Sequence, residues 1–235
     1  LADGIVAINS SAFAMCSELK EINFPDSLEY IGNFVFSECT SLESITFPDS
    51  VSALGKFVFS GCTSLKDVTL PANLQKIGDA AFYKCESLEL IDFPITLTEI
   101  GQAAFASTGM TSIKIPPTIT AIGYSAFGFY TNENDEIILD EDFVVMGYEG
   151  SYAQTYCQEN EVTFLALDED EAAGSDEKAE NQTFSKRAIV LICIGGVLAV
   201  AAVIAAVIII KKRKSLKDKE DGEEESEENN YTEDE

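Results

Sequence analysis

The chain has 235 residues, with 15 Lys or Arg against 41 Asp or Glu, and its formal net charge is −26. Because nucleic-acid binding needs a basic surface, this balance argues against DNA and RNA as partners. Histidine is absent from the sequence, which rules out a histidine base and any histidine-containing metal site.

Residues 1–127 repeat one pattern, with most equivalent positions 23 residues apart. The columns that keep this interval include Ile31, Leu54, Ile77 and Ile100; Phe13, Phe36, Phe59, Phe82 and Phe105; Cys16, Cys39, Cys62 and Cys85; and Pro25, Pro48, Pro71 and Pro94. A fixed period of about 20 to 29 residues is typical of leucine-rich repeats. We therefore predict an α/β-type repeat solenoid, with a parallel sheet on one face and short turns or helical turns on the other.

Each repeat contains signals for a strand and a turn. Ile45 and Phe47 alternate along an extended segment, and Pro48 ends it because proline has no N–H for a ladder. A glycine stands in every repeat except the first, where Asn9 replaces it, so we predict a positive φ in this column. The phenylalanine that follows is expected to stack on its equivalent in the next repeat and form a continuous core.

The motif I-G-x-x-A-F-x-x-C-x-S-L-x-x-I-x-x-P, for example from Ile77 to Pro94, resembles the BspA-like class of leucine-rich repeat. That class occurs in surface proteins of bacteria and some parasitic protists. The resemblance is clear over 1–127 and extends to about residue 167. The resemblance implies adhesion to host or matrix proteins, or to other cells. An enzyme is not expected, because no feature of these residues supports one, although catalytic sequence upstream of Leu1 stays open.

The six cysteines do not have the spacing of a zinc site. Four of them share one solenoid column, and Cys157 and Cys193 lie further along the chain. Buried reduced thiols that act as small apolar side chains are favoured over a disulfide between neighbouring turns. The sequence also contains no calcium loop, phosphate-binding glycine loop or nucleophile elbow. We therefore expect no catalytic residue, no metal and no cofactor.

Residues 128–167 are predicted to be a unit that caps the C-terminal end of the array. Strands are expected at 137–139, 144–146 and 162–167, and a short helix is expected after Gly150. Ser151 and Gln154 have the spacing of a capping box at the start of this helix. Such a unit would cover a core and strand edge that would otherwise be open.

The remaining segments predict a membrane anchor. Residues 168–187 form an acidic linker that we expect to be disordered, and 188–210 form a stretch of 23 uncharged residues. As a helix this stretch is roughly 34 Å long, enough to cross a bilayer once. Basic residues follow it directly, so residues 211–235 are predicted to be a disordered cytoplasmic tail and the repeats to be extracellular.

The predicted span has small residues on one helix face, which would permit a weak dimer. These residues are Gly195, Ala199, Ala202 and Ala206.

The outward positions of the predicted strands are the candidate ligand contacts. They form an acidic and hydroxyl-rich stripe that we expect to line the concave sheet face and to bind an extracellular protein or glycan. Its members are Glu21, Asn23, Ser44, Thr46, Asp67, Thr69, Leu90, Asp92, Ser112 and Lys114. The alternative is a passive stalk that presents an N-terminal domain, because Leu1 aligns with the middle of a repeat and we expect further sequence upstream.

Overall fold

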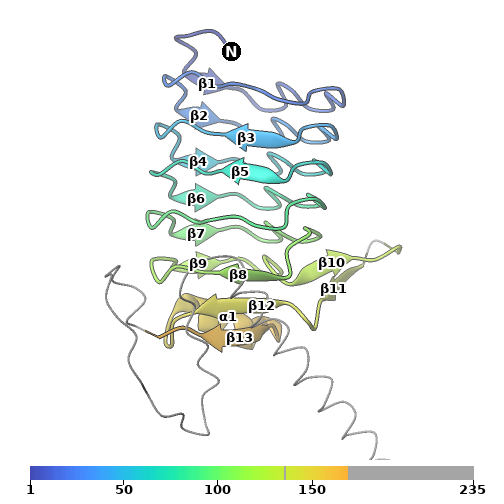
Figure 1. Ribbon diagram of the computed structural model, residues 1–235, viewed down its shortest axis with the longest axis vertical. Coiled ribbons are helices and arrows are strands. Elements are labelled where there is room, and N and C mark those ends of the chain that lie inside the picture. The colour runs from blue at the N-terminus through green and yellow to red at the C-terminus, as the bar shows by residue number, and fades with distance from the viewer. Residues whose placement is uncertain (135, 169–235) are drawn as a thin grey trace, which may run out of the picture. The chain divides into compact units, whose positions relative to one another are not determined.

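The structure is a computed structural model that describes residues 1–134 and 136–168 (Figure 1). The chain divides into two compact units, Leu1–Asp176 and Glu177–Glu235, and every described residue belongs to the first. The predicted linker beyond residue 168, the span, the tail and the helix-pairing residues therefore lie outside the described residues. Within the described ranges, no helix is both long enough and apolar enough to cross a membrane.

A ladder of two-residue parallel strands runs along one side of the repeats (Figure 1). Its registers join equivalent repeat positions, such as Ala53 with Lys76 and Lys76 with Glu99. The strands are β1 (Ala7–Ile8), β2 (Tyr30–Ile31), β4 (Ala53–Leu54), β6 (Lys76–Ile77), β7 (Glu99–Ile100) and β9 (Ala121–Ile122). The sequence does not predict this ladder, because two residues are too few to show the alternation that identifies a strand.

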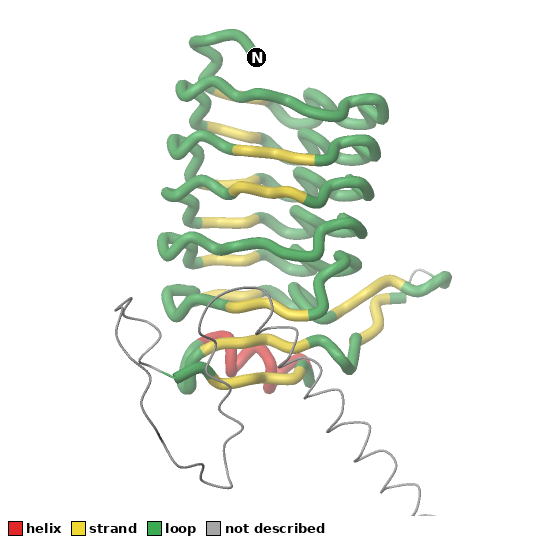
Figure 2. The backbone as a smooth tube through the Cα atoms, viewed as in Figure 1, coloured by secondary structure: helices red, strands yellow, loops and turns green. Residues whose placement is uncertain are grey.

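A second set of parallel strands occupies the segments where the sequence predicts them. β3 (Ser44–Thr46) pairs with β5 (Asp67–Thr69), and β8 (Ser112–Lys114) pairs with β12 (Val144–Gly147), which in turn pairs with β13 (Thr163–Ala166). Loops connect the short strands of each rung (Figure 2). The fold is thus a parallel solenoid with strands on two sides, whereas the sequence predicted a sheet on one face only.

The predicted phenylalanine stack fills the centre of the solenoid. Neighbouring rings lie nearly parallel, with centroids 5.4 Å apart for Phe13 and Phe36 and 5.0 Å apart for Phe82 and Phe105. From Phe36 onward the rings of this column are fully buried. Offset stacking of this kind adds to the free energy of apolar burial. The aromatic column therefore holds successive repeats in register.

Glycine recurs in its column for a different structural reason from the predicted positive φ. None of its glycines has a positive φ, and Asn9 does not either. A Cβ on Gly78 would instead lie 2.7 Å from the carbonyl carbon of Gly55, so these glycines permit close approach of successive backbones. Positive φ occurs two residues later, at non-glycine positions that include Phe34 and Phe57, both at 57°.

The C-terminal unit confirms the predicted strands and adds a hairpin. β10 (Phe129–Thr131) and β11 (Ile137–Leu139) pair antiparallel and project from the side of the solenoid (Figure 1). β12, helix α1 (Tyr152–Asn160) and β13 then close the array, and the hydroxyl of Tyr156 donates to the carbonyl of Phe127 at 2.7 Å.

The predicted capping box at the start of α1 is wrong. Ser151 occupies the N-cap position, but its hydroxyl oxygen is buried and has no hydrogen-bond partner. The side chain of Gln154 accepts a hydrogen bond from the N–H of Gly150 at 2.8 Å, one residue before the expected donor. The glutamine thus stabilises the turn before the helix.

Candidate functional site

The predicted stripe is present as two columns on the outer side of the second strand set. Ser44 lies opposite Asp67, and Thr46 lies opposite Thr69, in the register of β3 and β5. Ser112 and Lys114 belong to β8, whose registered neighbour is β12 rather than another repeat strand of the stripe. The remaining stripe residues lie in extended segments that are not assigned as strands; these are Glu21, Asn23, Leu90 and Asp92.

All but one of the stripe residues are exposed, and Ser112 is half-buried. The residue between the two members of each pair packs against the core: Ile45, Ile91 and Ile113 are buried, and Ile22 and Val68 are half-buried. Leu90 leaves 60% of its surface exposed and is the one apolar member of an otherwise polar stripe. The stripe can therefore supply hydroxyl and carboxylate hydrogen bonds together with one apolar contact.

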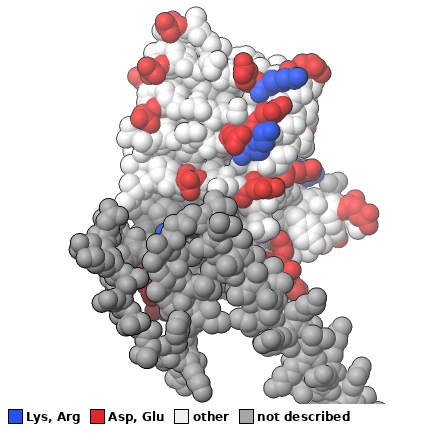
Figure 3. Space-filling view, in the orientation of Figure 1, with Lys and Arg blue, Asp and Glu red and all other residues white. Residues whose placement is uncertain are grey.

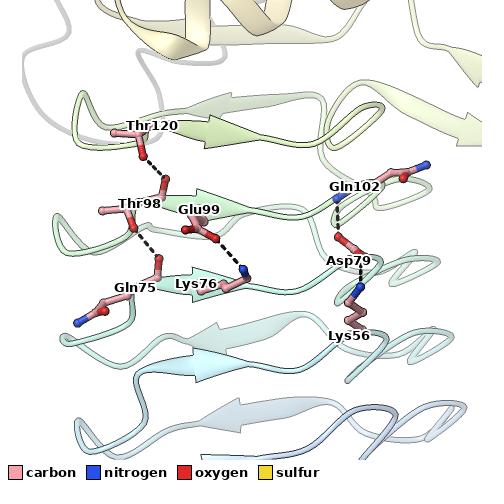
Figure 4. Close-up of polar contacts among 8 residues, drawn as sticks. All are labelled: Lys56, Gln75, Lys76, Asp79, Thr98, Glu99, Gln102 and Thr120. Carbon is pink, nitrogen blue, oxygen red and sulfur yellow. Dashed lines mark hydrogen bonds and ion pairs between the residues drawn. The ribbon is translucent and has the colours of Figure 1, made fainter.

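A second polar surface lies over the two-residue ladder (Figure 4). Lys56 pairs with Asp79 at 2.7 Å, and Lys76 pairs with Glu99 at 2.6 Å, each across successive rungs. The hydrogen bond from Lys56 holds the pKa of Asp79 below its usual value, and the hydrogen bond to Glu99 raises the pKa of Lys76. These pairs are exposed, so each contributes little to the free energy of unfolding.

Threonine hydroxyls extend this surface along the same ladder. Thr98 donates from its hydroxyl to the carbonyl of Gln75 at 3.1 Å, and Thr120 donates in the same way to the carbonyl of Thr98 at 3.3 Å (Figure 4). These residues are not among the predicted ligand contacts, although opposite charges one repeat apart are visible in the sequence. Across the face drawn in Figure 3, acidic side chains lie scattered or beside basic ones, and no large patch has a single sign.

The cysteine column is structural. Cys39, Cys62 and Cys85 are buried, and each donates its thiol to a carbonyl oxygen 26 residues earlier. The acceptors are Phe13, Phe36 and Phe59, at 3.1, 3.0 and 3.2 Å respectively.

Burial raises the pKa of Cys39 to about 11 and that of Cys157 to about 12, so these thiols stay protonated and unreactive. The prediction of buried thiols is thus confirmed for the four cysteines with numbers 39, 62, 85 and 157. It is wrong for Cys16, which is exposed in the first described rung.

Two phenylalanines form a partly exposed stack near the start of the array. The rings of Phe34 and Phe57 lie 4.8 Å apart and are parallel within 2°, and Phe34 leaves 42% of its surface exposed. Both residues hold a left-handed backbone conformation, which costs a non-glycine residue roughly 1 to 2 kcal/mol. Other repeats have serine or alanine at this position.

The described residues contain no group of three or more His, Cys, Asp or Glu side chains arranged to hold a metal ion.

Comparison with protein families identifies the class of repeat. Residues 6–134, more than half of the chain, match the BspA type leucine rich repeat region in six copies. The chain therefore belongs to this family of leucine-rich-repeat proteins. The comparison with curated proteins finds no match.

Solved leucine-rich-repeat structures resemble the chain over part of their length. The T. pallidum leucine rich repeat protein is 28% identical, with a TM-score of 0.41, over 62% of this chain and 54% of that one. A leucine-rich repeat protein from Bacteroides ovatus is 25% identical, with a TM-score of 0.37, over 70% of this chain and 50% of that one. A leucine rich cell surface protein from Faecalibacterium prausnitzii is 23% identical, with a TM-score of 0.40, over 58% and 49%. The chain thus spans about half the length of these proteins.

Proposed function

We propose that this chain is a cell-surface binding protein that uses the stripe to recognise a protein or glycan outside the cell. The observation that carries the proposal is the stripe itself, in which nine of the ten side chains are exposed while the residues between them are buried (Ile45, Ile91, Ile113) or half-buried (Ile22, Val68). Membership of the BspA type leucine-rich-repeat family supports a role in protein interaction or adhesion.

The first three rungs of the stripe are held rigidly. β3 pairs with β5, and the N–H of Glu43 donates to the carbonyl of Lys20 at 3.2 Å. Little conformational entropy is therefore lost when a ligand binds. From the rung of Glu21 to that of Ser112 the stripe is about 19 Å long, since strands lie about 4.8 Å apart. This is shorter than a typical protein interface, so we expect neighbouring loops to contribute.

Membrane anchoring is part of the same proposal. Residues 188–210 would cross the bilayer once, with the repeats outside and residues 211–235 in the cytoplasm. The uncharged length of this segment and the basic residues that follow it support this topology. Association of the spans through Gly195, Ala199, Ala202 and Ala206 would be weak and would raise the apparent affinity for a multivalent ligand.

Charge reversal within the stripe tests the proposal. The full chain would be displayed on cells and screened against immobilised matrix proteins and a glycan array, and then compared with the double variant Asp67→Lys, Asp92→Lys. The control is Asp3→Lys, Glu29→Lys, which makes the same change in net charge at exposed positions outside the stripe. We expect the stripe variant to lose about tenfold or more in affinity for the captured ligand, while the control binds normally. Normal binding by both variants would show that the ligand site lies outside the stripe, and no capture at all would favour the passive stalk.

A further inference from the structure

We propose that the free edge of β11 is a second binding site, which takes an extended basic peptide by strand addition. The hairpin of β10 and β11 interrupts the repeat pattern and projects from the solenoid (Figure 1). Neither of its strands pairs with a strand of the stripe.

The hydrogen bonds at both ends of the hairpin show which backbone groups point outward. Asp140 donates its N–H to the carbonyl of Gly128 at 2.8 Å, and Asn132 donates to the carbonyl of Glu136 at 3.0 Å. Along an antiparallel pair, two kinds of residue alternate. One exchanges N–H and C=O hydrogen bonds with the residue opposite, and the next points its N–H and C=O groups away from the partner strand. The bonded residue of β11 is therefore Ile138, while the N–H and C=O groups of Ile137 and Leu139 point away from β10.

The two edges of the hairpin differ in their partners. On the β10 side, Ser107 donates its N–H to the carbonyl of Phe129 at 2.8 Å, and the N–H of Thr131 donates to the hydroxyl of Ser107 at 2.8 Å. On the β11 side, no group in the described part of the chain pairs with the outward N–H and C=O groups of Ile137 and Leu139. The hairpin is thus fixed to the solenoid by one edge and open at the other.

The open edge of β11 is short and has acidic neighbours, but its three residues include no lysine, proline or bulge, which commonly block edge strands in native proteins. β11 consists of two isoleucines and a leucine, and Ile137 leaves 48% of its surface exposed. An extended peptide could add main-chain hydrogen bonds here and pack apolar side chains beside Ile137.

The charge around β11 determines the kind of partner. Glu133 and Glu136 precede the strand, and Asp140, Glu141 and Asp142 follow it directly. A second copy pairing antiparallel about Ile138 would place its Asp140 opposite Glu136, and like charges directly opposite each other destabilise a sheet. A peptide with a β-branched centre and Lys or Arg on both sides meets complementary charge at each end. The basic peptide is therefore the occupant that this edge favours.

Hydrogen exchange on the full chain tests the proposal directly. The probe is the blocked peptide acetyl-Lys-Arg-Val-Thr-Val-Arg-Lys-amide, and its control carries N-methyl groups at alternate backbone positions. We expect the amides of Ile137 and Leu139 to exchange freely in the chain alone and to slow about tenfold or more when the probe is added. The N-methylated peptide should bind about tenfold more weakly, because it cannot complete the ladder.

Two variant pairs separate the backbone contribution from that of charge. Ile137→Pro removes an outward N–H without removing the ladder donor of Ile138, whereas Ile137→Thr keeps the donor and serves as its control. We expect only the proline variant to lose probe binding. Glu133→Lys with Glu141→Lys should weaken the basic probe at least tenfold and favour a peptide with Glu in place of Lys and Arg.

Three results would overturn the proposal. One is equal affinity for the N-methylated peptide. The second is probe-induced protection that falls on β3 and β5 instead of β11. The third is protection of Ile137 and Leu139 by self-association in the absence of the probe, which would identify a second copy as the occupant.

Discussion

Replacing Gly78 by alanine should strongly destabilise the solenoid, because the added Cβ meets the backbone of the preceding rung. It would lie 2.7 Å from the carbonyl carbon and oxygen of Gly55 and from the amide nitrogen of Lys56. The rungs cannot separate freely at this point, since Gly78 donates its N–H to the carbonyl of Leu54 at 3.0 Å. Overpacking costs about 1 to 3 kcal/mol, and one or two weakened ladder bonds add about 1 kcal/mol each. We therefore expect a loss of about 2 to 5 kcal/mol in the free energy of unfolding.

Urea denaturation of the full chain, followed by circular dichroism, measures this loss as a lower midpoint. The control is Met15→Gly, at an exposed position whose φ is 61°. Relief of the left-handed strain and the greater freedom of the unfolded chain nearly cancel there, so this variant should change stability by less than about 1 kcal/mol. A loss below about 1 kcal/mol for Gly78→Ala would refute close backbone approach as the reason for the glycine column.

Three further predictions follow from the buried polar groups. Tyr156→Phe leaves the N–H and carbonyl of Phe127 without their partner, which should lower the free energy of unfolding by about 2 to 3 kcal/mol in a thermal melt; an unchanged melting temperature would contradict this. A thiol-alkylating reagent should modify Cys16 in the native chain and should modify Cys62 and Cys85 only after unfolding, as measured by mass spectrometry. Rapid labelling of all three cysteines in the native chain would contradict burial of the cysteine column. Cys39 has a folded pKa of about 11 against an ordinary value of 9.0. Its contribution to stability is therefore complete below pH 9.0 and is lost as the pH rises through about 11. The free energy of unfolding of a Cys39→Ala variant should fall less steeply over this pH range than that of the unchanged chain.

The sequence predicted those parts of the fold that rest on large apolar side chains. The interval between Phe36 and Phe59 predicts their stacking, and the alternation of Ile45 and Phe47 predicts β3. Such patterns are visible because a buried side chain must recur once per rung. The stripe residues were found by the same logic, since they alternate with buried ones, but alternation alone does not identify a ligand.

Features that depend on backbone geometry were not predicted correctly. The glycine at position 78 permits close approach and not a positive φ, and the sequence cannot distinguish the two because glycine satisfies both. The pairing of β10 with β11 was also missed, since Phe129 to Thr131 lies where the repeat pattern fades. Its partner strand was predicted at 137–139, but strand pairing depends on contacts across a loop that no local pattern encodes.

The thiols of Cys39, Cys62 and Cys85 all donate toward the preceding rung, which gives the array a direction. During synthesis from the N-terminus, each new thiol therefore meets an acceptor that is already in place, whereas the backbone N–H groups of Phe36 and Phe59 bond to the carbonyls of Val58 and Ala81 in the repeat that follows. Each rung is thus completed only when its successor has formed. Lengthening such a protein by duplicating one unit would need no new chemistry at the junction.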